Sequence, residues 1–322
     1  MLFSKFVINN YKKTAFSRHD ADGSIFYFSA EDFPGMNREE YSFKNQNGEC
    51  LVGAFYCYDG YKENRLIVFD HGMGTGHNAY MREIETLAKA GYRVYSYDHT
   101  GCTLSEGEGI RGLSGSLADL DACIEALRAD FPTLDISVVG HSWGAFSTMN
   151  IPAYDQSLRS VVAISGFTSL KSMHKQVLSG PLALFRKTVF EYERSQNGKY
   201  AEAQAENSLR DAGVPALIIH STDDKTVSAK HHFDKLREAL SDCNHVEFIS
   251  VYGKGHNPNY TADAVAYKDR FFIELTEKRK AGLLETDEQK ASFIASFDFE
   301  RMTEQDGEIW EKIITFLDKH FK

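Results

Sequence analysis

Residues 136–144 read Ile136-Ser137-Val138-Val139-Gly140-His141-Ser142-Trp143-Gly144. The run from Ile136 to Val139 is short, apolar and rich in β-branched residues, which predicts a buried strand, and a helix is expected to begin near Trp143. The G-x-S-x-G sequence therefore lies at a strand-to-helix turn. A serine on such a turn needs strained backbone angles, and only small residues fit two positions before and after it. Gly140 and Gly144 meet that requirement, so Ser142 is a candidate nucleophile.

Further runs of strand length occur on both sides of this turn, and we expect them to be buried on both faces. They are Arg65–Phe69, Tyr92–Tyr97, Ser160–Ile164, Ala216–Ile219 and Val246–Val251. Segments of helical period separate them: Asn78–Ala90, Leu117–Leu127, Trp143–Tyr154 and Ser228–Leu240, with a closing helix at Gly307–His320. Ser116-x-x-Asp119 is a predicted capping box for the second of these helices. Alternating strands and helices predict an α/β fold with a mostly parallel sheet and helices on both faces.

An antiparallel hairpin is predicted to precede this alternation. Tyr41–Lys44 and Leu51–Tyr58 flank Asn45-Gln46-Asn47-Gly48. Its Asn-Gly step supplies the positive φ that a hairpin turn requires.

The chain has 322 residues, more than the predicted sheet needs. The surplus falls at 167–209, an apolar segment that we interpret as a cap or lid insertion, and at 261–303, a charged segment of helical period before the closing helix. Neither has the Gly, Ser or Pro-rich composition of a flexible linker. We therefore expect one domain, 1–322, with two insertions packed on it.

The charge of the chain excludes several classes of partner. With 36 basic and 46 acidic residues, the net charge of −10 disfavours nucleic acid and anionic membranes and favours a small neutral or cationic substrate. Five cysteines without a C-x-x-C pair suggest neither a disulfide framework nor a cysteine zinc site. No run is long enough for a membrane span or a signal peptide, so a cytoplasmic location is expected.

A nucleophilic serine needs a histidine base and an acid that orients the base, and after a G-x-S-x-G turn the acid precedes the histidine. Asp223 and Asp224 follow the strand Ala216–Ile219, and His256 follows the last strand, in a glycine-containing turn. The carboxyl ends of parallel strands meet at one edge of a sheet. Other histidines also end strands, but they precede the serine or lie in another loop, so His256 is the predicted base.

The loop His71-Gly72-Met73-Gly74-Thr75-Gly76 follows the strand Arg65–Phe69. It is not a dinucleotide-binding G-x-G-x-x-G sequence, because His77 stands where the last glycine belongs. We interpret it as the loop that brings the Met73 N–H to a developing oxyanion, where it joins the Trp143 N–H at the start of the helix.

In these features the sequence resembles the α/β-hydrolase superfamily, and more narrowly its bacterial esterase, monoacylglycerol-lipase-like and aminopeptidase-like members. The resemblance covers about Tyr41 to His256 and the closing helix, and includes the loop Asp98-His99-Thr100-Gly101 with Ser105 and Gly107. The Asp224-x-x-Val227 step resembles the family's acid, so the resemblance implies a Ser142, Asp224 and His256 triad. Thr103 stands where the family usually has glycine, Ala145 where many members have glycine, and the chain after His256 is unusually long.

The resemblance implies a serine hydrolase that cleaves a carboxylic ester of a small or medium acyl group through an acyl-enzyme, with no cofactor and no metal. Two alternatives stay open. The same triad could cleave an amide, as in an aminopeptidase whose 167–209 segment binds the substrate amine through a glutamate. The chain could also be a receptor or scaffold that retains the fold without catalysis.

Overall fold

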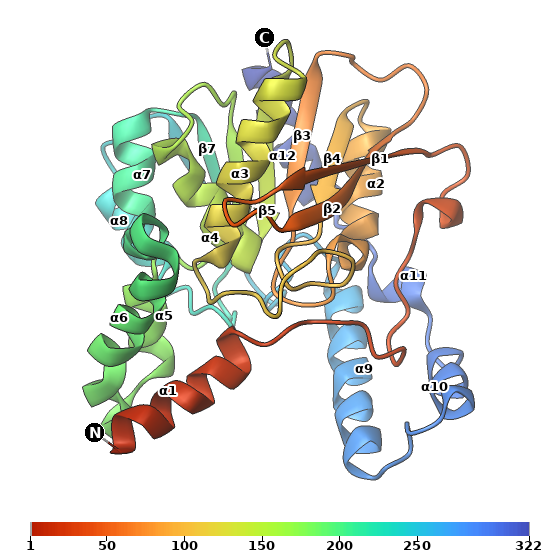
Figure 1. The fold of residues 1–322 in the computed structure, drawn as a ribbon. Coiled ribbons are helices and arrows are strands. Elements are labelled where there is room, and N and C mark those ends of the chain that lie inside the picture. Colours follow the sequence, from red (N-terminus) through yellow and green to blue (C-terminus); the bar gives the residue numbers. More distant parts are fainter. Residues whose placement is uncertain (1, 322) are drawn as a thin grey trace.

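A computed structural model describes residues 2–321 and contains one sheet within them. Its eight strands lie in the spatial order β1-β2-β4-β3-β5-β6-β7-β8 (Figure 1). They are β1 (Asn37–Lys44), β2 (Cys50–Cys57), β3 (Arg65–Asp70), β4 (Arg93–Tyr97), β5 (Asp135–His141), β6 (Val161–Ile164), β7 (Ala216–Ser221) and β8 (Val246–Val251). The β1–β2 hairpin pairs antiparallel and joins β4 in the same sense, whereas β3 to β8 pair in parallel. The predicted α/β architecture is confirmed.

Helices cover both faces of this sheet. The helices are α1 (Leu2–Ala15), α2 (Met81–Lys89), α3 (Gly115–Asp130), α4 (Trp143–Asn150), α5 (Leu170–Val177), α6 (Arg186–Asn197), α7 (Ala205–Ala212), α8 (Phe233–Ala239), α9 (Ala262–Lys280), α10 (Asp287–Ile294), α11 (Phe299–Met302) and α12 (Gly307–His320). One face packs on α3, α4, α7 and α8 through residues such as Leu120 and Phe146. The other face packs on α2 and α12 through residues such as Ile84 and Ile313. The two apolar clusters fix the sheet in the middle of the molecule.

Two local predictions differ from the structure. Ser114, not Ser116, is the N-cap of α3, and the Asp119 carboxylate accepts from the Thr100 amide at 2.8 Å, so the predicted capping box is wrong. Strand β8 is an edge strand, and Val246 is its only buried residue within the described chain, so the strand is not buried on both faces. Thr103, which stands where the family usually has glycine, has a φ of 44°, and this left-handed conformation explains why glycine is favoured at the position.

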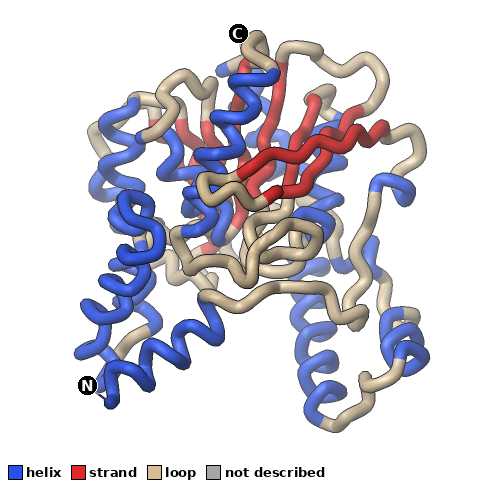
Figure 2. Tube along the Cα trace, viewed as in Figure 1, coloured by secondary structure: helices blue, strands red, loops and turns tan. Residues whose placement is uncertain are grey.

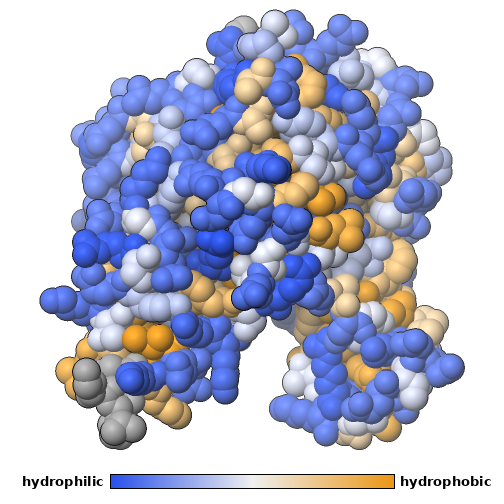
Figure 3. All heavy atoms as spheres, in the orientation of Figure 1, coloured by the Kyte–Doolittle hydropathy of each residue, from blue (hydrophilic) through white to orange (hydrophobic). Residues whose placement is uncertain are grey.

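Two helical arms extend from the sheet on the side where the parallel strands end (Figure 1). The first contains α5 and α6 of the 167–209 segment, and α1 packs against α6. The second contains α9 and α10 of the 261–303 segment, which has its own apolar cluster around Phe271, Leu275 and Phe293. Loops gather below the sheet between the two arms (Figure 2), and the molecular surface is notched there (Figure 3). The single-domain organisation with two insertions stays a proposal.

None of the helices found in residues 2–321 has the length and apolar character needed to cross a bilayer.

Candidate active site

The turn between β5 and α4 holds Ser142 in a strained conformation. Its φ is 57° and its ψ is −110°, a backbone conformation that residues other than glycine rarely adopt. A Cβ on Gly140 would lie 2.6 Å from the Gly144 carbonyl oxygen, and one on Gly144 would collide with the carbonyl oxygen of Asp70, the last residue of β3. The two glycines are therefore required by close packing, as the sequence pattern predicts.

Ser142, His256 and Asp224 form a continuous hydrogen-bonded relay. Ser142 Oγ lies 2.8 Å from His256 Nε2, and His256 Nδ1 lies 2.7 Å from Asp224 Oδ2. An ionised carboxylate can only accept, so the proton is assigned to Nδ1, and Nε2 is then the acceptor for the serine hydroxyl. The turn after β5 and the loops after β7 and β8 thus place the three predicted side chains in the order that general-base activation of a serine requires.

Asp224 is held as an anion. Its side chain is fully buried, and Oδ1 accepts from the backbone amides of Thr226 at 2.8 Å and Val227 at 2.9 Å. Burial alone would raise the pKa of Asp224, but hydrogen bonds from His220 and His256 outweigh it and hold the pKa well below its usual range. The carboxylate can therefore stabilise an imidazolium that forms on His256.

Asp223, the other candidate acid, is hydrogen-bonded to different groups. Its Oδ1 accepts from Ser221 Oγ at 2.5 Å and from the Gly253 amide at 3.0 Å. These bonds tie the loop after β7 to the loop after β8. Of the two adjacent aspartates, it is therefore Asp224 whose carboxylate is hydrogen-bonded to His256.

His141, the residue before Ser142, takes part in the site although the sequence reasoning set it aside. Its Nε2 donates to the His256 carbonyl oxygen at 2.8 Å, and Tyr80 Oη donates to its Nδ1 at 2.9 Å. Burial lowers the pKa of His141 to about 3, with the field of His256 adding to the effect, so the ring is neutral. The contact joins two segments more than a hundred positions apart, and the only signal for it in the sequence was the place of His141 beside the serine.

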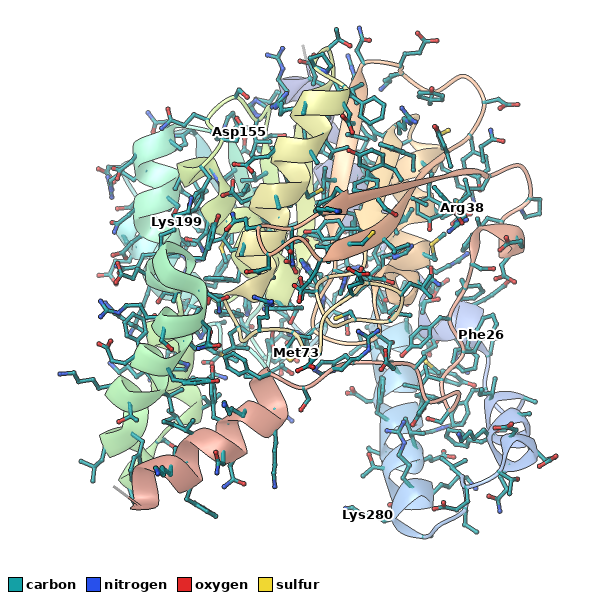
Figure 4. The ribbon with its side chains drawn as sticks, viewed as in Figure 1. Phe26, Arg38, Met73, Asp155, Lys199 and Lys280 are labelled. Carbon is teal, nitrogen blue, oxygen red and sulfur yellow. The ribbon has the colours of Figure 1, made fainter. Side chains whose placement is uncertain are left out.

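The two predicted oxyanion donors lie at the site. Trp143 is the first residue of α4, so its amide is at the positive end of that helix. Met73 lies below the sheet between the arms (Figure 4) and lines the cleft that contains Ser142 and His256. Within residues 2–321 neither amide donates to another protein group, which leaves both available to a ligand oxygen.

A buried ion network lies behind the turn. His99 Nε2 lies 3.0 Å from Asp70 Oδ1, and His99 Nδ1 lies 3.3 Å from Asp119 Oδ2. Burial alone would lower the pKa of His99, but the two carboxylates raise it to about 9. The protonated ring packs against Trp143 in a tilted arrangement, with a centroid distance of 4.7 Å and an interplanar angle of 53°, so this network supports the start of α4.

Two adjoining cavities meet at the site. The cleft over the relay has a volume of about 250 Å³ and is lined by Met73, Tyr80, His141, Ser142, His256, Asn257, Lys268, Asp269 and Phe272. A neighbouring cavity of about 420 Å³ shares Met73, Tyr80, Lys268 and Phe272 with it. Residues 20–27, the loop 72–76, α9 and α11 line most of this second cavity, and many of the side chains are aromatic. The residues that line the two cavities include none from the 167–209 segment.

One family model and several solved structures are similar to parts of the chain. Residues 61–199 match the family described as serine aminopeptidase, S33. No curated protein sequence matches the chain significantly.

Several solved structures share the fold at low sequence identity. An esterase of Pyrococcus furiosus superposes with a TM-score of 0.59 and 18% identity, over 82% of this chain and 98% of that one. An esterase domain from a Rhodothermus marinus protein has a TM-score of 0.51 and 17% identity, over 76% of this chain and 98% of the domain. An acylaminoacyl peptidase of Pyrococcus horikoshii gives 0.54 and 19%, over 77% of this chain but only 42% of the peptidase. The shared fold is that of the α/β-hydrolases.

Proposed function

The chain is an α/β-hydrolase-fold protein, and from that premise we propose that it is a serine hydrolase that cleaves carboxylic esters through an acyl-enzyme. The observation that carries the proposal is the relay in which His256 lies 2.8 Å from Ser142 Oγ and 2.7 Å from Asp224. A serine hydroxyl becomes an effective nucleophile at neutral pH when such a base removes its proton.

The proposed reaction has two acyl transfers. Ser142 Oγ attacks the ester carbonyl while His256 Nε2 takes its proton, and the amides of Met73 and Trp143 stabilise the tetrahedral oxyanion. The C–O bond to the alcohol then breaks as His256 returns the proton to the leaving oxygen. Water, deprotonated by His256, cleaves the acyl-enzyme by the same steps and regenerates Ser142. Asp224 keeps the imidazole oriented and stabilises its charge in both halves.

The two cavities support a substrate of small or medium size. The relay faces the 250 Å³ cleft, and the 420 Å³ cavity beside it, which has many aromatic side chains in its wall, offers room for an apolar acyl group. Because the 261–303 segment and the N-terminal segment line this second cavity, we assign acyl selection to them. The 167–209 segment then acts as a cap only if it moves.

Amide hydrolysis is the second candidate, and the match of residues 61–199 to a serine aminopeptidase family favours it. An aminopeptidase of this design needs a carboxylate for the substrate amine. In the 167–209 segment, Glu193 is fully buried and accepts from the Leu113 amide at 2.8 Å, while Glu191 and Glu202 both pair with Arg194. None of the residues that line the two cavities comes from this segment, so its glutamates do not face the relay, and the ester proposal is preferred.

The test compares purified protein with the Ser142→Ala variant on 4-nitrophenyl butyrate and on aminoacyl and prolyl anilides. We expect turnover of the ester with an initial burst of 4-nitrophenol, and loss of both in the variant. Anilide turnover that exceeds ester turnover would replace the ester proposal with the peptidase. If neither substrate class is hydrolysed, a non-catalytic receptor or scaffold becomes the better explanation.

A further inference from the structure

Lys268 on α9 lies where the two cavities adjoin, because it lines both of them. Its Nζ donates to Asn257 Oδ1 at 3.3 Å and lies 4.7 Å from the centroid of the Tyr260 ring. The ammonium thus stands beside the loop that carries His256. Nothing in the proposed acyl transfer uses it.

The charges around Lys268 leave it without a direct partner. Glu83 is buried, and its Oε1 accepts from Asn259 Nδ2 at 3.2 Å; although its field reaches Lys268, the two groups form no ion pair. Asp269 is exposed on the cleft rim, where water screens its charge. Arg279, the other cation of the larger cavity, is paired with Asp22 at 2.6 Å. Within residues 2–321, no carboxylate forms a salt bridge with the Lys268 ammonium.

An ammonium in this position gains from an anionic ligand. Burial lowers the pKa of Lys268, and the fields of Glu83 and Asp269 only partly oppose that effect. Most of the neighbouring wall is aromatic or aliphatic, so a charge-assisted hydrogen bond formed there is shielded from water. The same charge repels a substrate amine. The acidic net charge of the chain predicts a neutral or cationic substrate. The cavities are lined by charges of both signs, but the ammonium of Lys268 has no ion pair within the described residues, and this favours an anionic group on the substrate.

We propose that Lys268 is a specificity-determining residue that binds a carboxylate on the substrate, so that the preferred substrates are esters that also carry a free carboxylate. This inference rests on the proposed serine hydrolase function and names the substrate class of the same site. A single unpaired ammonium matches the charge of a carboxylate, whereas a phosphate dianion requires further cationic donors. The carboxylate can belong to the acyl part or to the alcohol part, since Lys268 borders both cavities.

The experiment measures kcat/KM for two matched pairs of esters. Mono-4-nitrophenyl adipate and its terminal carboxamide differ only in charge on the acyl side. The 4-carboxyphenyl and 4-carbamoylphenyl hexanoates differ only on the alcohol side. We expect the kcat/KM of the wild type to be about tenfold higher for the carboxylate in one of the two pairs. The pair that shows this preference identifies whether Lys268 binds a carboxylate on the acyl part or on the alcohol part of the substrate.

The Lys268→Met variant should bring that preference to about one, and Lys268→Arg should retain part of it. Lys280→Met is the matched control, because Lys280 is exposed at the far end of the same helix (Figure 4) and should leave the ratio at its wild-type value. Ratios near one in the wild type overturn the inference. So does a Lys268→Met variant that slows both members of a pair equally, which would mean that Lys268 only positions Asn257. Absence of any ester turnover overturns the proposed function itself.

Discussion

The imidazole of His141 holds the backbone of His256: its Nε2 donates to the His256 carbonyl oxygen at 2.8 Å. The residue before the candidate nucleophile therefore fixes the loop that carries the candidate base, while Tyr80 fixes the His141 ring from the other side. This makes His141 a positioning residue.

Replacing His141 with leucine should lower kcat by about tenfold with KM changed by less than about twofold, because a small displacement of His256 affects proton transfer more than binding. His141→Gln keeps a donor at a similar reach and should recover part of kcat. Steady-state kinetics on one ester decides the question. Equal kcat values for the leucine and glutamine variants would show that the hydrogen bond has no role.

The adjacent aspartates offer a matched pair of variants. Asp224→Asn removes the negative charge beside His256 and should lower kcat by about a thousandfold or more, because the amide favours the wrong tautomer of the imidazole. Asp223→Asn leaves that contact intact and weakens only the tie between the loops, so its loss in kcat should stay within about tenfold. A larger loss for Asp223→Asn than for Asp224→Asn would reverse the assignment of the acid.

The packing of the turn predicts a large effect on stability for a single methyl group. A Cβ on Gly144 would collide with the Asp70 carbonyl, so Gly144→Ala should reduce the free energy of unfolding by about 1–3 kcal/mol or more. Gly307→Ala is the control, since a Cβ there meets no atom within 4 Å and the residue begins α12. Denaturant unfolding of both variants gives the comparison. Similar stabilities of the two variants would contradict the close packing.

The pKa of His99, raised to about 9 by Asp70 and Asp119 against the effect of burial, predicts a pH dependence of stability. Between about pH 6.5 and 9 the folded state keeps a proton that the unfolded state has lost. The stabilisation from this network is therefore complete below pH 6.5 and decreases by about 1.4 kcal/mol per pH unit above it. Unfolding free energies measured across this range should decline for the wild type and decline less for His99→Gln. Parallel curves for the two proteins would exclude a protonated His99.

The elements around Ser142 could be predicted from the sequence because their signals are local. Strand β5, the two glycines and the start of α4 follow from a short apolar run and from backbone sterics, and α12 begins and ends where its period indicates. The order of the acid and the base along the chain pointed to His256 and left Asp223 and Asp224 as candidate acids, and the resemblance of the Asp224-x-x-Val227 step to the family favoured Asp224.

Features that depend on contacts between distant segments could not be predicted in this way. The capping-box prediction failed because Thr100, on another loop, takes the Asp119 carboxylate. Helix α1 carries no strong signal of its own and packs against α6. The walls of the larger cavity combine residues 20–27 with α9 and α11, segments that are far apart in the sequence. Its volume and the placement of Lys268 therefore depend on the tertiary structure.

The most direct measurement is labelling by a fluorophosphonate probe, with the modified residue located by mass spectrometry. Such a probe reacts with a serine that a neighbouring base has activated. We predict a single adduct on Ser142 in the wild type, no adduct in Ser142→Ala, and much slower labelling in His256→Ala. Absence of labelling in the wild type, or an adduct on a different serine, would contradict the assignment of Ser142 as the nucleophile.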